Sequence, residues 1–440
     1  MSTDQLVTHV LAGTAVVVLL AHLLGALATR LGQPEVIGEI FAGIALGPSL
    51  LGQLPGDLTG RLFPVEVVPY LQVVSQVALV FFLFSVGYEL DLRVLRRTRR
   101  AVPAVTVTAF AIPMALGAGA AYLLGSLYTP PGGPAPDNVG FVLFLAVSMA
   151  LTAVPVLASI VRERGAADSL PGVVAMTSAG LMDAAGWLVL AAAVMIGGTS
   201  PHDHMPLPAT LALFAVYALA MVYVARLLLR RWLRRPGALP RRDVPVIVAL
   251  ATASAWATSA LGLHVIFGAF VAGLIMPRNA DGTPHEDLMR PLQETGNLLL
   301  PLFFVVSGLS VDIGSLTGKD CALLAILTLI AVAGKLGGGT LGARLGGLSS
   351  RDATIIGVML NTRGLTELVA LNIGLQSGII DERLYTVLVI VALLTTVVTG
   401  PLLTLLRFPQ ATERGTGDTV AAPRSGADDL APASGSSGAA

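Results

Sequence analysis

Charged side chains are scarce in this chain of 440 residues. Asp, Glu, Lys and Arg make up only 12% of it, whereas hydrophobic residues make up 54%. The mean hydropathy is +0.79. A soluble domain carries about 25% charged residues, so this composition argues against a soluble enzyme and indicates a polytopic membrane protein.

The chain also lacks the residues of several common sites. Its one cysteine, Cys321, excludes an intrachain disulfide and a cluster of cysteine ligands for zinc. No P-loop, G-x-S-x-G or H-E-x-x-H motif is present, so nothing predicts ATP hydrolysis or hydrolase chemistry. We expect no enzyme activity, no cofactor and no resident metal. The arginine clusters at 93–100 and 226–242 are expected to meet anionic lipid rather than nucleic acid.

Long apolar runs are what the chain has instead. We count about 13 of these runs. A helix needs roughly 20 residues to span the hydrocarbon core. They lie at about residues 6–29, 36–51, 67–87, 101–128, 139–161, 171–196, 207–229, 244–261, 265–276, 290–311, 321–345, 353–378 and 384–406. The second and ninth are short, which indicates tilted, broken or shielded helices. The first is too long for a signal peptide and is interpreted as a membrane span.

The positions of Lys and Arg indicate the orientation. Nearly all basic residues of the connecting loops follow odd-numbered segments, whereas only Arg61, Lys319 and Arg383 follow even-numbered ones. Because basic loops stay in the cytoplasm, we expect a multi-pass protein of the cell membrane with its N-terminus outside and its C-terminus in the cytoplasm. After a membrane unit at 1–407, residues 408–440 are rich in Ala, Gly, Ser and Pro and are predicted to be a disordered cytoplasmic tail.

The segments divide into two halves, 1–6 and 8–13, of which the second is inverted. The fifth segment of each half is interrupted by residues that weaken a helix: Thr152 and Pro155 in one, and Asn361, Thr362 and Gly364 in the other. Corresponding interrupted helices in inverted halves point to a substrate site at the membrane midplane. We therefore expect an all-α polytopic membrane protein of about 13 transmembrane helices, in two inverted six-helix repeats that each contain a discontinuous helix.

One carboxylate, Asp183, lies within the sixth apolar run, in S-A-G-L-M-D-A-A-G-W, and no Lys or Arg lies in that run. An ionisable group at membrane depth costs about 2.5–3.5 kcal/mol even on the lenient insertion scale, so it is a candidate functional group. A carboxylate can hold a small cation or a proton but not both, which is the minimal chemistry of cation/proton exchange. The alternative is a structural acid satisfied by helix ends.

Lys335, in segment 11, is the conspicuous charge partner for Asp183. Glycines recur every four residues from Gly334 to Gly346 and form one face that allows close helix approach. We expect Lys335 to pair with Asp183 when no cation is bound. A lysine that snorkels to the membrane edge is the alternative.

Polar residues near the interruptions complete the candidate site. Thr152 and Asn361 offer side-chain oxygens to a cation, together with carbonyls freed by the breaks. Arg363 and Glu367 stand four residues apart, and structural pairing with each other is favoured over a direct part in transport. The residues expected to break or support these helices are Pro155, Thr362, Arg363, Gly364 and Glu367.

Two acids, Glu35 and Glu39, open segment 2 in P-E-V-I-G-E. The Gly and Pro content predicts a bent helix lining a funnel through which ions enter. A purely structural bend is the alternative.

At these stretches the chain resembles the monovalent cation:proton antiporter family 2, the bacterial sodium or potassium/proton exchangers and their plant relatives. The resemblance covers nearly all of residues 1–407. It rests on Q-P-E-V-I-G-E-I-F-A-G-I-A-L-G-P-S-L-L-G from Gln33, F-S-V-G-Y-E-L-D from Phe84, L-T-A-V-P-V-L from Leu151, H-V-I-F-G-A-F-V-A-G-L-I-M-P from His264, L-P-L-F-F-V-V-S-G-L from Leu300, Gly334-Lys335 and N-T-R-G-L-T-E-L-V-A-L-N-I-G-L from Asn361.

The resemblance implies a sodium/proton antiporter-like fold in which a core domain moves against a scaffold that also forms a homodimer. The scaffold would comprise about 1–100 and 243–315, the core about 101–196 and 320–407, and a linker helix about 207–242. Asp183 matches the family's ion-binding aspartate and Lys335 its core-domain lysine. Thr152 and Asn361 fall at the crossing of the broken helices.

Met182 departs from the family pattern, because many relatives have Asp-Asp or Asn-Asp where this chain has Met-Asp. A thioether is a poor ligand for Na⁺ or K⁺. One acid fewer favours one-for-one, electroneutral exchange. We therefore expect a Na⁺ or K⁺/proton antiporter working by alternating access. The alternatives are a proton- or sodium-coupled exporter of an organic solute, and a non-transporting membrane sensor.

Overall fold

The computed structural model describes residues 2–56, 58–89, 100–127, 139–166, 169–197, 207–233, 240–261, 264–278 and 285–408. Within these ranges the chain is helical and contains no strand. The predicted tail lies outside the described residues from 409 onward, as do residues 93–99 and 234–239 of the arginine clusters.

The helices follow the apolar segments closely. The long ones are α1 (Thr3–Arg30), α4 (Val68–Glu89), α5 (Ala101–Leu127), α8 (Leu170–Gly197), α11 (Pro240–Ala260), α13 (Glu286–Leu309), α14 (Gly318–Leu345) and α17 (Glu382–Leu405). Segments 2 and 9 form the shorter α2 (Glu35–Leu46) and α12 (Val265–Ile275). Segment 7 forms α9 (Leu207–Leu219), a π-helical stretch at Ala220–Ala225 and α10 (Arg226–Leu233). Short helices η1 (Leu51–Gln53), α3 (Leu58–Leu62) and η4 (Ile313–Ser315) lie in connections.

Two segments are broken, as their sequences predict. Segment 5 forms α6 (Val139–Ala150) and α7 (Val154–Glu163), and segment 12 forms α15 (Ser350–Met359) and α16 (Leu365–Gln376). Among the described residues, 11 helices are long and apolar enough to cross a membrane, with α6 and α7 taken as one span. The short α12 and the pair α15–α16 account for the other predicted segments. The all-α membrane fold is therefore confirmed.

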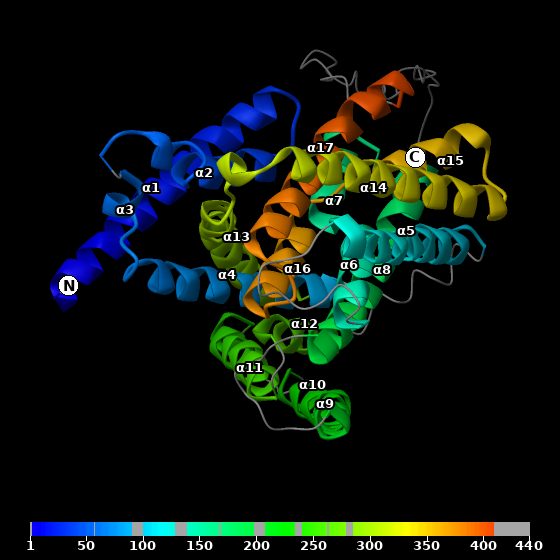
Figure 1. Cartoon of the computed structure of the whole chain (residues 1–440). Coiled ribbons are helices and arrows are strands. Elements are labelled where there is room, and N and C mark those ends of the chain that lie inside the picture. The colour runs from blue at the N-terminus through cyan, green and yellow to red at the C-terminus, as the bar shows by residue number, and fades with distance from the viewer. Residues whose placement is uncertain are drawn as a thin grey trace, which may run out of the picture.

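The helices pack in two groups (Figure 1). Helices α1, α2, α4, α11, α12 and α13 make their most extensive contacts with one another, and so do α5, α6, α8, α14, α15 and α17. Figure 1 shows α1, α2 and α4 on one side of the view and α5, α14 and α15 on the other, with α16 and α17 between them. The division into a scaffold and a moving core stays a prediction.

Glycines bring α14 and α5 into close contact, as the four-residue repeat predicts. A Cβ on Gly338 would lie 2.7 Å from the Thr108 carbonyl oxygen, and one on Gly342 would lie 2.6 Å from Val105 Cα. No larger residue fits there without moving one helix. These two unbroken helices, α5 and α14, are thereby held in close contact.

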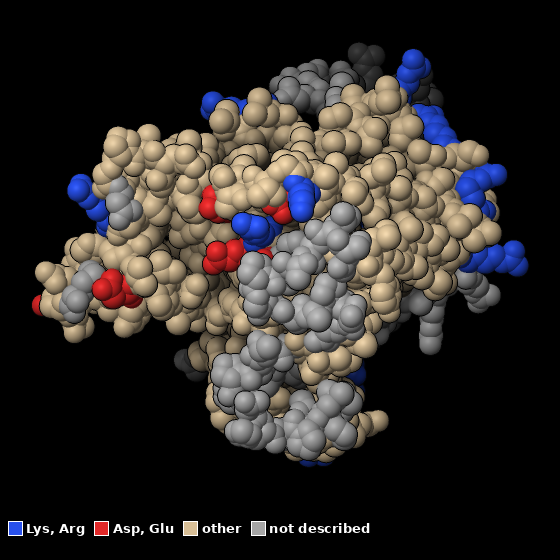
Figure 2. All heavy atoms as spheres, viewed as in Figure 1, with Lys and Arg blue, Asp and Glu red and all other residues tan. Residues whose placement is uncertain are grey.

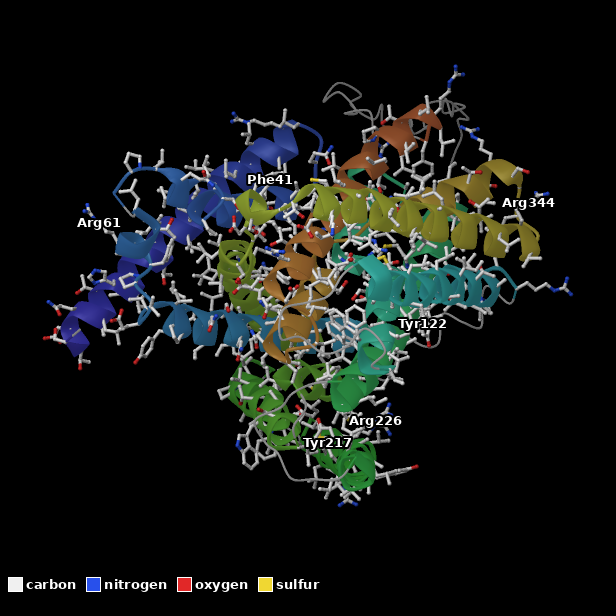
Figure 3. The ribbon with its side chains drawn as sticks, viewed as in Figure 1. Phe41, Arg61, Tyr122, Tyr217, Arg226 and Arg344 are labelled. Atoms are coloured by element: carbon white, nitrogen blue, oxygen red, sulfur yellow. The ribbon has the colours of Figure 1, made fainter. Side chains whose placement is uncertain are left out.

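The outer surface is largely apolar. Figure 2 shows that most of the visible face carries neither acidic nor basic side chains, and that many of the Lys and Arg lie near its edges. Figure 3 shows Tyr122 on α5, whose side chain is exposed, and Arg61 and Arg344 extending from opposite ends of the view. Exposed leucines such as Leu19 and Leu329 lie on long helices. This surface is typical of a protein whose sides contact lipid.

Candidate functional site

The two broken helices cross at their interruptions. The backbone N–H of Ala153 donates to the Thr362 carbonyl at 3.1 Å, and Thr152 Oγ1 donates to the Leu360 carbonyl at 3.2 Å. A helix end leaves carbonyls without intrahelical partners. Thr152 in the first interruption therefore donates to one of the free carbonyls at the end of α15.

Two buried basic side chains donate hydrogen bonds to the free carbonyls at the end of α6. Arg363 donates to the carbonyls of Ser148 at 2.7 Å and Met149 at 2.6 Å, and Lys335 Nζ donates to the carbonyl of Ala150. Because the last carbonyls of a helix carry partial negative charge, cations are favourable there. Lys335 and Arg363 thus stabilise the interruption that the fold needs.

Arg363 also forms the predicted pair with Glu367. Arg363 Nη1 lies 2.5 Å from Glu367 Oε1, and both side chains are completely buried. Arg363 lies in the turn before α16, and Glu367 lies in the first turn of that helix. The pair therefore lies inside the core, beside the crossing.

Lys335 forms no hydrogen bond or salt bridge with Asp183 in the described part of the chain, and the expected pairing of the two stays a prediction. Its ammonium also donates to Thr152 Oγ1 at 2.6 Å and to the Ala109 carbonyl at 3.4 Å. An ammonium has three N–H donors, and neutral oxygens accept all three. The carbonyl of Ala150, which the helix break leaves without an intrahelical partner, competes with Asp183 for the Lys335 ammonium. Looking in the sequence for opposite charges does not reveal such an acceptor.

Asp183 lies on α8 and is only 2% exposed. Neither of its carboxylate oxygens has a hydrogen-bond partner among the described residues. A buried charged carboxylate without a partner costs several kcal/mol. The neighbouring Met182 is fully buried in an apolar cluster with Leu157 and Val174, so its thioether fills the core.

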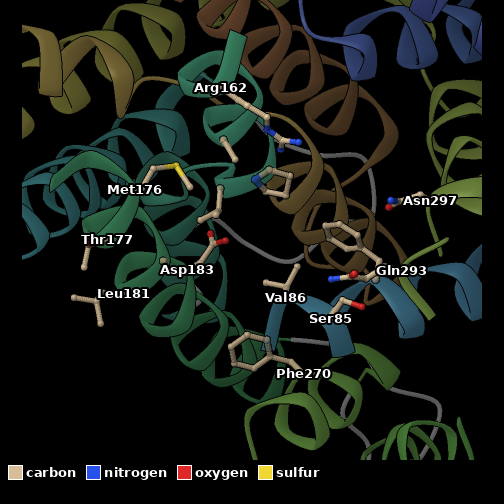
Figure 4. A pocket seen from close by; sticks show the side chains of 15 residues that line it. Ser85, Val86, Arg162, Met176, Thr177, Leu181, Asp183, Phe270, Gln293 and Asn297 are labelled. Atoms are coloured by element: carbon tan, nitrogen blue, oxygen red, sulfur yellow. The ribbon is translucent and has the colours of Figure 1, made fainter. Parts of the chain in front are cut away.

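Asp183 faces a cavity of about 570 Å³ (Figure 4). Helices α7 and α8 line it on one side, and α4, α12 and α13 line it on the other. Figure 4 shows Gln293 and Ser85 across the cavity from Asp183. The polar lining residues besides Asp183 are Ser85, Arg162, Thr177, Gln293 and Asn297. The sequence analysis missed these five as site residues, since isolated polar residues within apolar helices give little signal.

The cavity includes Pro155 but neither Thr152 nor Asn361. Asn361 Nδ2 donates to the Thr395 carbonyl at 3.0 Å and to Thr399 Oγ1 at 3.4 Å, while its buried Oδ1 bonds none of the described residues. Thr152 is occupied by Lys335 and Leu360. The role of Thr152 and Asn361 as cation ligands stays a prediction. Of their side-chain oxygens, only Asn361 Oδ1 has no hydrogen bond within the described residues.

Gly364 begins α16 with φ of +148°, a conformation that residues with a side chain rarely adopt. A Cβ there would also lie 3.0 Å from Val156 Cγ2 on α7. Thr362 closes the preceding turn by donating to the Met359 carbonyl at 2.9 Å. Both residues thus shape the second interruption, as predicted.

Thr396 on α17 supports the same turn. Its hydroxyl accepts from the Arg363 N–H at 2.9 Å and donates to the Arg363 carbonyl at 2.7 Å. The sequence analysis missed this residue, although T-T-V-V-T at 395–399 is a polar cluster within an apolar span.

Glu35 and Glu39 lie on the first turns of α2, and Glu39 is buried. Neither lines the cavity that Asp183 faces. Their role in ion access stays a prediction.

Comparisons with known proteins agree with this architecture. Residues 16–408 match the family model described as sodium/hydrogen exchanger, transmembrane. The chain is 35% identical over 411 residues to the Na⁺/H⁺ antiporter NhaS4 of Synechocystis, covering 91% of this chain and 98% of the relative. The chain is also 32% identical over 400 residues to the K⁺/H⁺ antiporter 1 of Saccharomyces cerevisiae. That alignment covers 89% of this chain and 45% of the relative.

The fold is similar to that of the sodium proton antiporter MjNhaP1 of Methanocaldococcus jannaschii at pH 8. The TM-score is 0.68 at 15% identity, with 91% of this chain and 98% of the other covered. The family match spans both broken segments, Asp183 and Lys335. The chain therefore belongs to the sodium/hydrogen exchanger family, which confirms the resemblance to cation:proton antiporters.

Proposed function

We propose that this protein exchanges a monovalent cation, Na⁺ or K⁺, for a proton across the cell membrane by alternating access. The observation that carries the proposal is Asp183, a carboxylate at the wall of a cavity of about 570 Å³, neither of whose oxygens bonds any residue that the structure describes. The names of relatives include both Na⁺/H⁺ and K⁺/H⁺ antiporters, which supports the reaction and leaves both ions as candidates.

The charge on Asp183 controls movement of the core. An unpaired carboxylate is costly to carry through a water-free closed state. A bound cation or a bound proton removes that charge, so the core moves only when loaded with one or the other. Because one carboxylate holds one ion at a time, exchange is one-for-one. One pH unit then drives a tenfold cation gradient, about 1.4 kcal/mol per ion.

The core is the group α5–α8 and α14–α17, and the scaffold is α1, α2, α4 and α11–α13. The cavity lies between these two groups, which is where relative movement would open and close a path. We place the N-terminus outside and the C-terminus in the cytoplasm, and we place the homodimer contact on the scaffold. With this orientation, Arg162 marks the cytoplasmic end of the cavity, and we propose that the cavity opens to the cytoplasm.

An exporter of an organic solute is the second candidate. A volume of about 570 Å³ falls within the range of small-molecule pockets, roughly 300–1,000 Å³. Proton-driven extrusion of such a solute, with no response to Na⁺ or K⁺, would favour it.

Proton flux in proteoliposomes with an imposed pH gradient tests the proposal. Na⁺, K⁺, Li⁺ or Rb⁺ is added in turn to wild type, to Asp183→Asn and to Asp287→Asn, which alters an exposed aspartate on α13. We expect Na⁺ or K⁺ to dissipate the gradient in wild type and Asp287→Asn but not in Asp183→Asn. Failure of all four ions from pH 6 to 9, with folded protein, would reject the proposal.

A further inference from the structure

A buried proline interrupts the hydrogen bonding of α5 without ending that helix. Pro113 lies in the middle of α5, which continues from Ala101 to Leu127. A proline has no backbone N–H, and its ring pushes against the carbonyl of the residue four positions earlier. The carbonyl of Ala109 therefore lacks the donor that any other residue at position 113 would supply. A buried carbonyl without a donor is costly, so it requires a partner from another helix.

Lys335 on α14 is that partner. Its Nζ donates to the Ala109 carbonyl at 3.4 Å, and its other two hydrogen bonds reach Thr152 Oγ1 and the Ala150 carbonyl. The Ala150 carbonyl is free because α6 ends there, and the Ala109 carbonyl is free because of Pro113. Two separate interruptions of backbone hydrogen bonding therefore hold one ammonium.

The glycine face of α14 brings Lys335 to the proline in α5. A Cβ on Gly334 would lie 3.2 Å from Pro113 Cα, and one on Gly338 would lie 3.0 Å from Ala109 Cα. Gly334 directly precedes Lys335, so the lysine leaves α14 where the two helices touch. The position of the ammonium thus depends on α5 as well as on the broken helix.

Asp183 lies beside this group of hydrogen bonds without sharing in it. Gly186, about one turn along α8 from Asp183, would place a Cβ 2.5 Å from Leu151 Cδ2 and 3.8 Å from Phe110 Cε2. Those two residues directly follow the ones whose carbonyls hold Lys335. The charges of Asp183 and Lys335 also interact electrostatically. An ammonium that lost one neutral acceptor would therefore find a carboxylate nearby.

Among the described residues, Glu367 is the other acid that interacts with Lys335, but its Oε1 already bonds Arg363. Neither oxygen of Asp183 bonds any residue that the structure describes. A buried carboxylate without a partner gains more from an ammonium than one that is already paired. Asp183 is therefore the group to which a released Lys335 would turn.

We propose that Pro113 is a positioning residue for the exchange: it frees the Ala109 carbonyl, which holds the Lys335 ammonium away from Asp183. The carboxylate then stays open to a monovalent cation or a proton from the cavity. A residue with an N–H at position 113 draws the Ala109 carbonyl back into the helix, and the released ammonium competes with the cation. The inference rests on the proposed function, because it explains what keeps the exchange site free of a neighbouring fixed cation.

A double-mutant cycle measures the contact between Lys335 and Asp183. Lys335→Gln, Asp183→Asn and the double variant are made in wild type and in Pro113→Ala, and are unfolded in mild detergent with choline in place of Na⁺ and K⁺. The cycle gives the coupling between the two residues in each background. We expect little coupling in wild type. In Pro113→Ala we expect a coupling worth at least about a tenfold change in the unfolding equilibrium, as for a hydrogen bond to a charged group.

Cation affinity tests the consequence of this contact. The Kd for Na⁺ or K⁺ is obtained from the rise in melting temperature with cation concentration. Asp183 paired with Lys335 cannot bind a cation, so the apparent Kd should rise about tenfold in Pro113→Ala. The rise should disappear in Pro113→Ala/Lys335→Gln. A proline that only packs against α14 does not predict this dependence on Lys335.

Two further variants are controls. Pro113→Gly also supplies an N–H but differs from Pro113→Ala in side-chain size and helix propensity, so it should raise the Kd to a similar extent. It also takes the place of Pro113→Ala if that variant fails to fold. Pro401 lies within α17 and is exposed, so Pro401→Ala should leave the Kd unchanged. An equal rise in Pro401→Ala would overturn the role of Pro113.

Equal coupling of Lys335 and Asp183 in the two backgrounds would also overturn the inference, as would a rise in Kd that persists in Pro113→Ala/Lys335→Gln. Either result leaves the proposed exchange standing if Na⁺ or K⁺ dissipates the pH gradient in wild type. If wild type shows no cation-driven proton flux, the exchange is rejected. The coupling measured without cations still decides the role of Pro113.

Discussion

Replacement of Glu367 by Gln removes one charge of the buried ion pair and leaves Arg363 in place. Both side chains of the pair are 0% exposed, so water cannot replace the lost carboxylate. Removing one partner of a buried pair costs about 3–5 kcal/mol, because the remaining charge is uncompensated. We expect Glu367→Gln to lower the free energy of unfolding by this amount.

The chain contains a matched control for this change. Arg290 and Glu294 have the same i, i+4 spacing and lie 2.8 Å apart, but their side chains are 78% and 66% exposed. Exposed pairs contribute about 0–1 kcal/mol. Glu294→Gln should therefore cost at least about 2 kcal/mol less than Glu367→Gln.

A double variant separates pairing from capping. Replacing a buried pair by apolar residues is often neutral. Arg363→Met/Glu367→Leu should nevertheless remain destabilised, because the Ser148 and Met149 carbonyls lose their donors at about 1–3 kcal/mol each.

The assay is denaturant unfolding of the purified protein in mild detergent, followed by circular dichroism and by retention of monodisperse protein. Similar small losses in Glu367→Gln and Glu294→Gln would refute the view that burial gives the first pair its energy. A neutral double variant would refute the capping role of Arg363.

Three further outcomes are expected. Because a proton and the cation compete for Asp183, the KM for the cation should rise tenfold for each unit by which the pH falls in the acid range, with kcat unchanged. A hundredfold rise per pH unit would show that two protons compete at the site instead of one. Gly364→Ala should abolish folding or transport, because of its φ of +148° and the 3.0 Å approach to α7, whereas Gly337→Ala, with nothing within 4 Å, should leave thermal stability equal or higher. Met182→Leu should keep transport and ion preference, since Met182 packs in the apolar core, and a changed preference among Na⁺, K⁺ and Li⁺ in the flux assay would contradict that placement.

Apolar length and helix breakers were sufficient to predict the helices. The breaks at Thr152–Pro155 and Asn361–Gly364 follow from residues that weaken a helix locally, and the structure has both. Asp183 was identifiable as a candidate because a lone acid in an apolar run is costly wherever the helix packs.

The partners of the charged residues were harder to predict, because they depend on three-dimensional contacts. Lys335 bonds a carbonyl that exists as a free acceptor only because α6 ends at Ala150. Thr396 bonds the backbone of Arg363 on a distant segment, and the polar cluster at 395–399 does not reveal which atoms it bonds. Backbone acceptors exposed by a helix break are therefore the main information that sequence reasoning lacked.

The single carboxylate at the cavity has a consequence for voltage. A core loaded with a monovalent cation and a core loaded with a proton carry the same total charge, whatever the charge of Lys335. The membrane potential, worth about 2.3 kcal/mol per elementary charge per 100 mV, therefore acts on the outward and the return movement with equal size and opposite sign. Under the proposed one-for-one exchange, voltage can change which movement is slower but does no net work over a complete cycle, so the final ion distribution would depend on concentrations alone.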